Sequence, residues 1–190
     1  FQIFYKNTKT QVTIINFTPK YYMIRKANLK DLHSVKKIAE ECATNMISQG
    51  VFQWNEHYPS LAIFKKDIEE ESLYVIDLKG IVCGCIMFSE EKVPLYNTID
   101  WLTPDHSNLY LHRLAIHPLQ QKKGWGKKLM DFAENYALEN GNISIRLDTF
   151  SQNLRNNTFY KARGYSRLGD VYFVKQSTFP FHCYEKVLQP

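Results

Sequence analysis

Two glycines, Gly124 and Gly126, stand among lysines in the stretch 117–128, and such a combination can bind a phosphate. Glycine has no Cβ, so the backbone can approach an anion closely at these positions. The apolar pattern that follows predicts a helix beginning at or near Gly126, and the first N–H groups of a helix have no intrahelical partner. The helix macrodipole adds positive potential at the same end. The turn is therefore predicted to bind a phosphate group, and a pyrophosphate fits it.

Two common phosphate-binding motifs fail at this turn. A P-loop requires G-x-x-x-x-G-K-[ST], but Lys128 follows Gly126-Lys127, and no glycine stands five residues before Gly126. The dinucleotide fingerprint G-x-G-x-x-G requires a third glycine where the chain has Leu129. Taken alone, the stretch is also compatible with a basic surface turn that binds nothing.

Length and composition favour one soluble globular domain with a core of its own. The chain has 190 residues, of which 44% are hydrophobic and 23% charged. The formal net charge of +5 favours an anionic ligand but lacks the dense basic stripes of a nucleic-acid binder. No window approaches the roughly 18 apolar residues of a membrane helix, and no secretory signal is apparent. We expect a cytoplasmic protein that binds neither nucleic acid nor membrane.

Cysteine and histidine spacing does not indicate a metal site. Cys83 and Cys85 share one face of a predicted strand, a spacing unlike the C-x-x-C pairs that bind zinc. These two, with Cys42 and Cys183, are expected to be free core residues, because small apolar packing is the usual role of a free cysteine. The six histidines are scattered along the chain. No metal cofactor is expected.

Hydrophobic periodicity and turn residues predict eleven elements in the order β-α-α-β-β-β-α-β-α-β-β. The strands are expected within 22–27, 72–78, 81–88, 108–117, 143–150, 165–174 and 181–188. The helices are expected between Asn28 and Gly50, within 61–71, from about Gly126 to Asn140, and within 153–163. Lys79-Gly80 is expected to form a tight hairpin turn, and 51–60 and 94–107 are expected to be loops. This order indicates one domain of the α/β or α+β kind, a mixed sheet with helices on both faces.

Two stretches closely resemble motifs of the GCN5-related N-acetyltransferase (GNAT) superfamily. "LHRLAIHPLQQKKGWGKKLMDFAENYA" (111–137) is similar to its acetyl-CoA-binding motif, an apolar strand, then [QR]-x-x-G-x-[GA], then a helix. "LDTFSQNLRNNTFYKARGY" (147–165) is similar to a second family motif. The resemblance implies the GNAT fold over 22–190, with a central mixed sheet of six to seven strands. Residues 1–21 are expected to be an N-terminal extension or an extra strand.

The resemblance implies an acetyl-CoA site between two splayed parallel strands, 109–117 and 143–150. The pantetheine arm would pair with the first of these strands. A backbone N–H group of that strand would face the thioester carbonyl. Asn153 would contact the cofactor arm, although capping a helix is an equal alternative. The expected cofactor-binding residues are Leu114, Ala115, Ile116, Gln121, Lys122, Lys123, Gly124, Trp125, Gly126, Lys127, Asn153 and Tyr160.

The resemblance also implies a general acid. Tyr160 falls on the family's acid tyrosine, and a phenol with a pKa near 10 can protonate a departing thiolate with a pKa near 8.5. The attacking amine must lose a proton, because only about one lysine-like amine in a thousand is uncharged at neutral pH. His112 and Glu56 are our candidates for the base. Trp54, Glu56 and Tyr58, in the loop between the first two helices, are expected to contact the acceptor.

We therefore expect an acetyl-CoA-dependent N-acetyltransferase whose acceptor is the primary amine of a small molecule. The resemblance implies direct attack in a ternary complex, and neither Cys83 nor Cys85 has an identifiable histidine partner for a covalent route. A protein or peptide amine is an alternative acceptor. A non-catalytic acyl-CoA-binding module is an alternative function. The chain could form a homodimer through an edge of the sheet.

Overall fold

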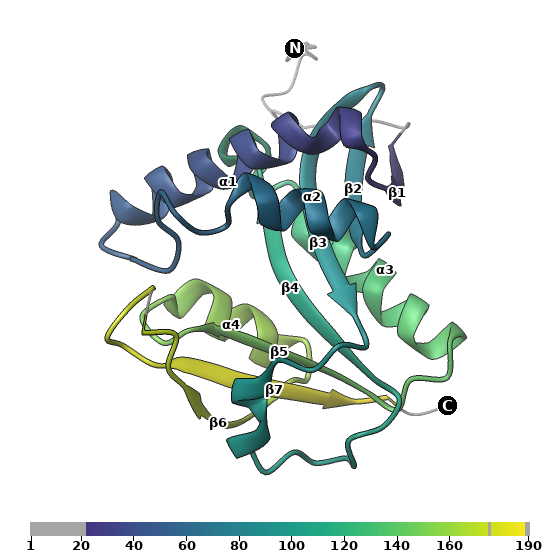
Figure 1. Ribbon diagram of the computed structural model, residues 1–190, viewed down its shortest axis with the longest axis vertical. Helices are drawn as coiled ribbons and strands as arrows, with labels where there is room; N and C mark the ends of the chain where they lie inside the picture. The colour runs from purple at the N-terminus through teal and green to yellow at the C-terminus, as the bar shows by residue number, and fades with distance from the viewer. Residues whose placement is uncertain (1–21, 175, 189–190) are drawn as a thin grey trace, which may run out of the picture.

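The computed structural model describes residues 22–174 and 176–188, so the extension predicted for 1–21 lies outside the described residues. The described part contains seven strands and four α-helices, in the predicted order (Figure 1). The strands are β1 (Met23–Lys26), β2 (Leu73–Leu78), β3 (Ile81–Ser89), β4 (Asn108–Ile116), β5 (Ser144–Phe150), β6 (Ser166–Val171) and β7 (Phe181–Val187). The helices are α1 (Leu32–Ile47), α2 (Leu61–Glu69), α3 (Trp125–Glu139) and α4 (Leu154–Ala162).

The strands form one mixed sheet in the order β1-β2-β3-β4-β5-β7-β6. Every neighbouring pair is antiparallel except β4 and β5, which are parallel. Parallel neighbours need a crossover connection, and α3 provides it. The prediction of a mixed sheet with six to seven strands is confirmed.

The helices cover both faces of the sheet. The apolar sides of α1 and α2 pack on one face in a cluster around Phe64, and α3 packs on the opposite face around Leu129. Figure 1 shows α1 and α2 crossing the upper half of the view, while α4 accompanies β5, β6 and β7 in the lower half. Within the described residues, no helix has the length and apolar character needed to cross a membrane.

Local sequence accounts for two of the boundaries that set this order. Asn28 accepts a hydrogen bond from the N–H of Lys30 and forms a capping box with Asp31, so the first helical segment begins there. At the predicted hairpin, Lys79 and Gly80 have φ values of 55° and 87°. A turn of two residues with positive φ matches the twist of the antiparallel strands that it joins.

The two parallel strands separate after a short paired stretch. Pairing joins Asn108–Leu111 of β4 to Ser144–Leu147 of β5, and no pairing continues beyond Leu111 and Leu147. The ends of both strands, 112–116 and 148–150, are thus free of each other. The splayed pair that the resemblance implied is present, and we call the space between these two ends the gap.

The segment before β4 is held against the sheet by a buried ionic network. This segment contains a short helix, η2 (Pro94–Thr98), within the predicted loop. The Arg146 guanidinium, fully buried, donates to Glu185 at 2.9 Å and to the hydroxyl of Tyr110 at 3.1 Å. The same guanidinium donates to the backbone of Thr103, and the Glu185 carboxylate accepts from the Thr103 hydroxyl at 2.6 Å. Satisfied buried charges of this kind fix one arrangement of the segment.

Candidate active site

Two cavities meet at the gap. The larger, about 640 Å³, lies between the C-terminal end of α1 and α4, beside the end of β4. The smaller, about 340 Å³, lies among α2, η2, the ends of β4 and β5, and the β6–β7 connection. Four residues line both cavities: Gln53, Trp54, Leu114 and Asn156. These shared residues make the two cavities neighbours at the gap.

The glycine turn leads into α3 as predicted. Gly124 is the N-cap residue with φ of 83°, and the helix begins at Trp125. The N–H of Lys128 makes a bond to the Gly124 carbonyl at 3.1 Å, so the N–H groups of residues 125–127 precede the regular helical bonds. Gly126 lines the larger cavity. The backbone here has the arrangement of an anion site at a helix N-terminus.

Side chains of the turn have different surroundings. Gln121 donates to the carbonyl of Ile116 at 3.0 Å and accepts from Arg155 at 2.8 Å, so it ties the turn to β4 and α4. Trp125 is 1% exposed, and only its backbone is available to the turn. The exposed lysines of the turn lie toward solvent: Lys122, Lys123 and Lys127. A phosphate at this turn would therefore meet mainly backbone N–H groups.

The predicted pantetheine-binding residues line the larger cavity. Leu114, Ala115 and Ile116 form its β4 wall. Asn153 caps α4 by accepting from the Asn156 N–H at 3.1 Å, so its predicted capping role is confirmed. Its amide nitrogen donates to Gln53 at 2.9 Å across the cavity. Asn153 thus faces the place where the resemblance puts the cofactor arm.

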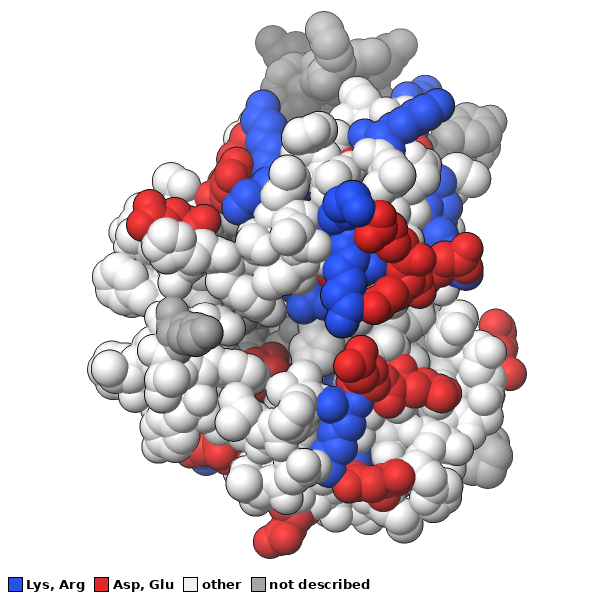
Figure 2. Space-filling model, in the orientation of Figure 1, with Lys and Arg blue, Asp and Glu red and all other residues white. Residues whose placement is uncertain are grey.

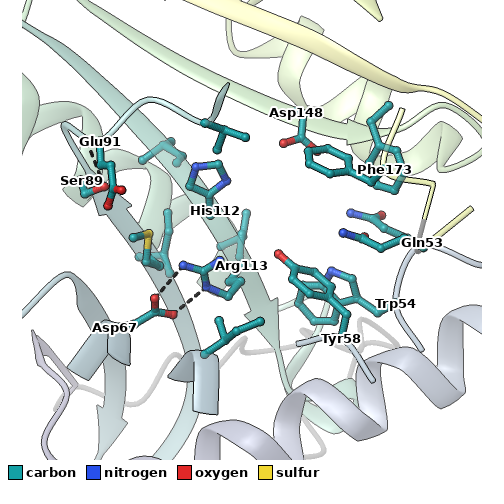
Figure 3. A pocket seen from close by; sticks show the side chains of 18 of the residues that line it. Gln53, Trp54, Tyr58, Asp67, Ser89, Glu91, His112, Arg113, Asp148 and Phe173 are labelled. Carbon is teal, nitrogen blue, oxygen red and sulfur yellow. Dashed lines mark hydrogen bonds and ion pairs between the residues drawn. The ribbon is translucent and has the colours of Figure 1, made fainter. Parts of the chain in front are cut away.

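The smaller cavity brings together residues from helices, strands and loops that are distant in sequence (Figure 3). Trp54 and Tyr58 line it, as expected of acceptor-binding residues, and Phe173 adds a third aromatic wall. Glu56 is not among its lining residues: its side chain is 84% exposed and pairs with His57. The position of Glu56 therefore corrects the expectation that it contacts the acceptor or serves as the base, because its side chain extends into solvent.

Asp148, on β5, is an acidic group in this cavity that the sequence analysis missed. Its Oδ1 accepts a hydrogen bond of 2.5 Å from the hydroxyl of Tyr96. Burial raises its pKa to about 6, against opposing contributions from Tyr96 and Arg113. A signal was present in the sequence, because Ser144, Arg146 and Asp148 occupy one face of a central strand. Three polar residues on such a face indicate a buried polar site as much as a solvated face.

His112 lies in the same cavity, with its ring stacked 6.2 Å from that of Tyr96. Burial, assisted by the positive charge of Arg113, lowers its pKa to about 3. The imidazole is therefore neutral at physiological pH but is a weak base. This environment argues against the expected role of His112 as the proton acceptor.

Tyr160 reaches the smaller cavity from α4 and is 6% exposed. Burial, and secondarily the charge of Asp148, raises the pKa of its phenol. The group is therefore protonated over the whole physiological range, as an acid must be before it reacts. Trp54, Tyr58, His112 and Tyr160 are thus brought together around one cavity.

The charges around the smaller cavity are unevenly paired. Three cations on its walls pair with carboxylates: Arg113 with Asp67, Lys66 with Glu70, and Lys92 with Asp105. Among the described residues, Asp148 and Glu91 lack such a partner. Figure 2 shows acidic and basic side chains interspersed on this face, around a hollow between its upper and lower halves. Within the described residues, no group of three or more His, Cys, Asp or Glu could hold a metal ion.

Comparison with known proteins places the chain in a family. Residues 32–165 match the family model described as "Acetyltransferase (GNAT) family", so the chain belongs to that family. A comparison with curated proteins gave no match. An acetyltransferase of the GNAT family from Streptococcus agalactiae is 22% identical with a TM-score of 0.75, over 89% of this chain and 96% of that one. The protein is an acetyl-CoA-dependent acetyltransferase.

Two structures of similar fold contain a cofactor. The PaiA N-acetyltransferase from Thermoplasma acidophilum, in complex with coenzyme A, is 18% identical with a TM-score of 0.65, covering 88% of this chain and 99% of that one. YncA from Salmonella typhimurium, with its cofactor acetyl-CoA, is also 18% identical with a TM-score of 0.65, covering 90% and 95%. At this identity the likeness concerns the fold.

Proposed function

We propose that the protein transfers the acetyl group of acetyl-CoA to a primary amine of a small molecule, by direct attack in a ternary complex. The observation that carries this proposal is the meeting of two cavities at the gap. The larger has a helix N-terminus at one end, and the smaller contains an ionisable carboxylate and a buried phenol. A thioester in the gap would then be open to attack from the smaller cavity.

In this proposal the backbone holds the cofactor. The N–H groups of residues 122–127 bind the pyrophosphate, and the backbone of 114–116 pairs with the pantetheine arm. Asn153 and Tyr160 contact the same arm from α4. The N–H of Leu114 faces the thioester carbonyl, where it stabilises the negative charge that develops on the oxygen during attack.

Asp148 replaces His112 and Glu56 as the proposed proton acceptor. A carboxyl group with a pKa of about 6 is ionised at neutral pH and can take the proton that the attacking nitrogen loses. Its Oδ1 is engaged by Tyr96, which leaves Oδ2 for the amine.

Proton uptake at Asp148 also prepares the acid. The negative charge of Asp148 contributes to the raised pKa of Tyr160. When Asp148 takes the proton from the amine, this contribution disappears, and the pKa of Tyr160 falls. The phenol is thus a stronger acid in the step that breaks the C–S bond, when the thiolate of coenzyme A needs a proton.

A covalent cysteine route has little support. Burial raises the pKa of the Cys83 thiol to about 11 and that of Cys85 to about 12. The thiolate is the nucleophilic form, and it is scarce for such groups at neutral pH. Direct attack by the amine requires no such intermediate.

The walls of the smaller cavity support a small cationic acceptor. Asp148 and Glu91 present carboxylates without a cationic partner among the described residues, and Trp54, Tyr58 and Phe173 provide aromatic surfaces. Ammonium groups bind favourably to both kinds of surface. The volume of about 340 Å³ is at the lower end of small-molecule sites. A peptide amine remains the second candidate acceptor, and the name of the PaiA N-acetyltransferase is consistent with an amine acceptor in general.

The test is acetyl transfer from acetyl-CoA to a panel of small primary amines and of lysine and N-terminal peptides, with products measured by mass. We expect transfer to small amines, and a fall of kcat of at least 30-fold in Asp148→Asn with acetyl-CoA affinity within about 3-fold, because a positioned base contributes about 10²–10⁴. Transfer only to peptides would favour the second acceptor class. Binding of acetyl-CoA with no transfer to any amine would support a non-catalytic role.

A further inference from the structure

β4 carries a bulge at the mouth of the gap. Its register with β3 shifts between Cys85 and Met87, so Arg113 and Leu114 together lie opposite a single residue of β3. Arg113 has φ of 52°, in the left-handed region that residues other than glycine rarely adopt. Such a conformation persists only where surrounding contacts hold it.

The peptide group between Arg113 and Leu114 has a defined direction. Its carbonyl oxygen accepts a bond of 3.7 Å from the thiol of Cys85, which belongs to β3. In a trans peptide the C=O and N–H groups point in opposite directions. The N–H of Leu114 therefore points away from the Cys85 thiol, which packs on the face of the sheet that α1 and α2 cover. Leu114 also lies beyond Leu111, the last residue of β4 that pairs with β5. Leu114 also lines both cavities.

An ion pair with α2 holds the side chain of Arg113. The guanidinium donates two parallel bonds to the carboxylate of Asp67, at 2.7 and 2.8 Å (Figure 3). The two side chains are only 11% and 4% exposed. Because the planar fork of arginine restricts both distance and orientation, a bidentate pair fixes Arg113 relative to α2.

Asp67 is itself anchored, and its charge depends on Arg113. Its backbone carbonyl accepts from the N–H of Ser72 at 2.9 Å and from the Ser72 hydroxyl at 3.1 Å. Burial raises the pKa of the Asp67 carboxyl, and the guanidinium of Arg113 opposes that rise. Loss of one partner alone would leave the other as a buried unpaired charge, which is strongly destabilising.

We infer that the Arg113–Asp67 ion pair is a positioning element: it holds the left-handed backbone at Arg113 and so keeps the N–H of Leu114 directed into the gap. The inference rests on the proposed function, in which that N–H stabilises the developing charge on the thioester oxygen. Helix α2, which lines the smaller cavity, thereby sets the position of the Leu114 N–H group that would bond to acetyl-CoA.

Two double variants separate the backbone conformation from the charges. Asp67→Asn with Arg113→Gly, and Asp67→Asn with Arg113→Ala, both lack the ion pair and leave no lone charge buried. Only glycine adopts positive φ without strain. We expect the alanine variant to lose at least 30-fold in kcat with the KM for acetyl-CoA changed less than about 3-fold, since one oxyanion donor contributes about 10²–10³. We expect the glycine variant to retain at least about ten times the kcat of the alanine variant. Equal loss in both would overturn the inference.

A matched control removes the Lys65–Glu69 pair, on the exposed side of the same helix. Lys65→Met with Glu69→Gln is expected to leave kcat unchanged, and thermal unfolding verifies that each variant is folded. If the alanine variant does not fold, Arg113→Lys takes its place, because lysine keeps the charge but cannot form the two parallel bonds.

A second measurement requires no acceptor. The ratio of the dissociation constants of coenzyme A and acetyl-CoA reports on the carbonyl contact, because coenzyme A has no thioester carbonyl. We expect this preference for acetyl-CoA to fall in the alanine variant and to persist in the glycine variant, with coenzyme A binding equal in both. An unchanged preference in the alanine variant would overturn the inference. Absence of transfer by the wild-type protein would count against the proposed function alone.

Discussion

At the scale of single residues, the proposed chemistry depends on the environment of Asp148. A solvated aspartate would be a poor proton acceptor, because its ordinary pKa of 3.8 lies far below neutral pH. Burial brings the pKa to about 6, and the Tyr96 hydroxyl limits that rise by donating to the carboxylate. Tyr96 is fully buried, so its hydroxyl has one fixed position. Orientation and basicity of the carboxylate are thus controlled together.

The variant Tyr96→Phe tests whether the Tyr96 hydroxyl limits the pKa of Asp148. Phenylalanine fills the same space but removes the donor, so the pKa of Asp148 should rise further. A hydrogen bond to a charged group contributes about 1.5–3 kcal/mol, so the acidic limb of the kcat/KM profile should move up by about one to two pH units. Tyr110→Phe is the control, since Tyr110 belongs to the same apolar cluster but bonds to Arg146 instead. A limb that stays in place in Tyr96→Phe would contradict the pairing of Tyr96 with Asp148.

Sequence alone predicted the candidate residues that belong to local motifs. The turn at 121–127 and Tyr160 were predicted from motif spacing along the chain, and the structure places Gln121 and Gly126 at the larger cavity and Tyr160 at the smaller one. Asp148 and the Arg113–Asp67 pair were missed because their partners are distant in sequence; Asp67 and Arg113 are 46 positions apart. The charge of Glu56 in an aromatic loop makes it a candidate from sequence, but the direction of a loop side chain depends on packing that the sequence does not reveal.

At the scale of elements, the order of strands and helices was predictable because periodicity and turn residues are local signals. Two features of the elements were not: η2 within the 94–107 segment and the bulge in β4. Tyr96 of η2 bonds to Asp148 of β5, and the bulge depends on the register of β4 with β3. Both concern contacts across the sheet, and both border the smaller cavity.

Gly84, on β3, tests how closely β3 and β4 must approach beside the cofactor groove. A Cβ on Gly84 would lie 2.8 Å from the backbone oxygen of Ala115 and 2.5 Å from Cδ1 of Ile116. The Ile116 side chain can rotate, but the backbone oxygen can retreat only if the strands separate. We expect Gly84→Ala to weaken acetyl-CoA binding about ten-fold by calorimetry, and to cost about 1–3 kcal/mol of stability.

The matched control is Gly169→Ala. Its Cβ would meet only the side chain of Ile99, the nearest atom being Cδ1 at 2.9 Å. Neither residue lines the larger cavity. Acetyl-CoA affinity should therefore be unchanged in this variant. Equal weakening in both variants would show that general loss of stability, rather than strand separation at the groove, lowers the affinity.

At the scale of the whole molecule, the separation of β4 and β5 creates the site and also lowers the stability of the fold. The ends of β4 and β5 give up mutual hydrogen bonds, and the space between them contains a carboxyl group with a raised pKa. For an acid, a raised pKa means that the folded state disfavours the charged form. With the proposed role of Asp148 as proton acceptor, function and stability oppose each other at this residue, as is common at active sites.

The pH dependence of unfolding measures this opposition. Between the ordinary pKa of 3.8 and the folded value of about 6, the folded protein binds more protons at Asp148 than the unfolded chain does. The contribution of this group to stability is thus complete below pH 3.8 and is lost as the pH rises through about 6. Asparagine has no charge to disfavour, so Asp148→Asn should be more stable than the wild type at pH 8, by about 1–3 kcal/mol.

That advantage of Asp148→Asn should decline as the pH falls toward 3.8. His112 contributes the opposite trend, because its pKa is lowered to about 3 and stability is lost as the pH falls below 6.5. Both proteins contain His112, so its effect cancels when urea unfolding of the two is compared at each pH from about 4 to 8. A constant difference across this range would show that Asp148 does not titrate near pH 6 in the folded protein. A growing advantage toward pH 8, together with the loss of kcat, would show that one carboxylate supports catalysis at the expense of stability.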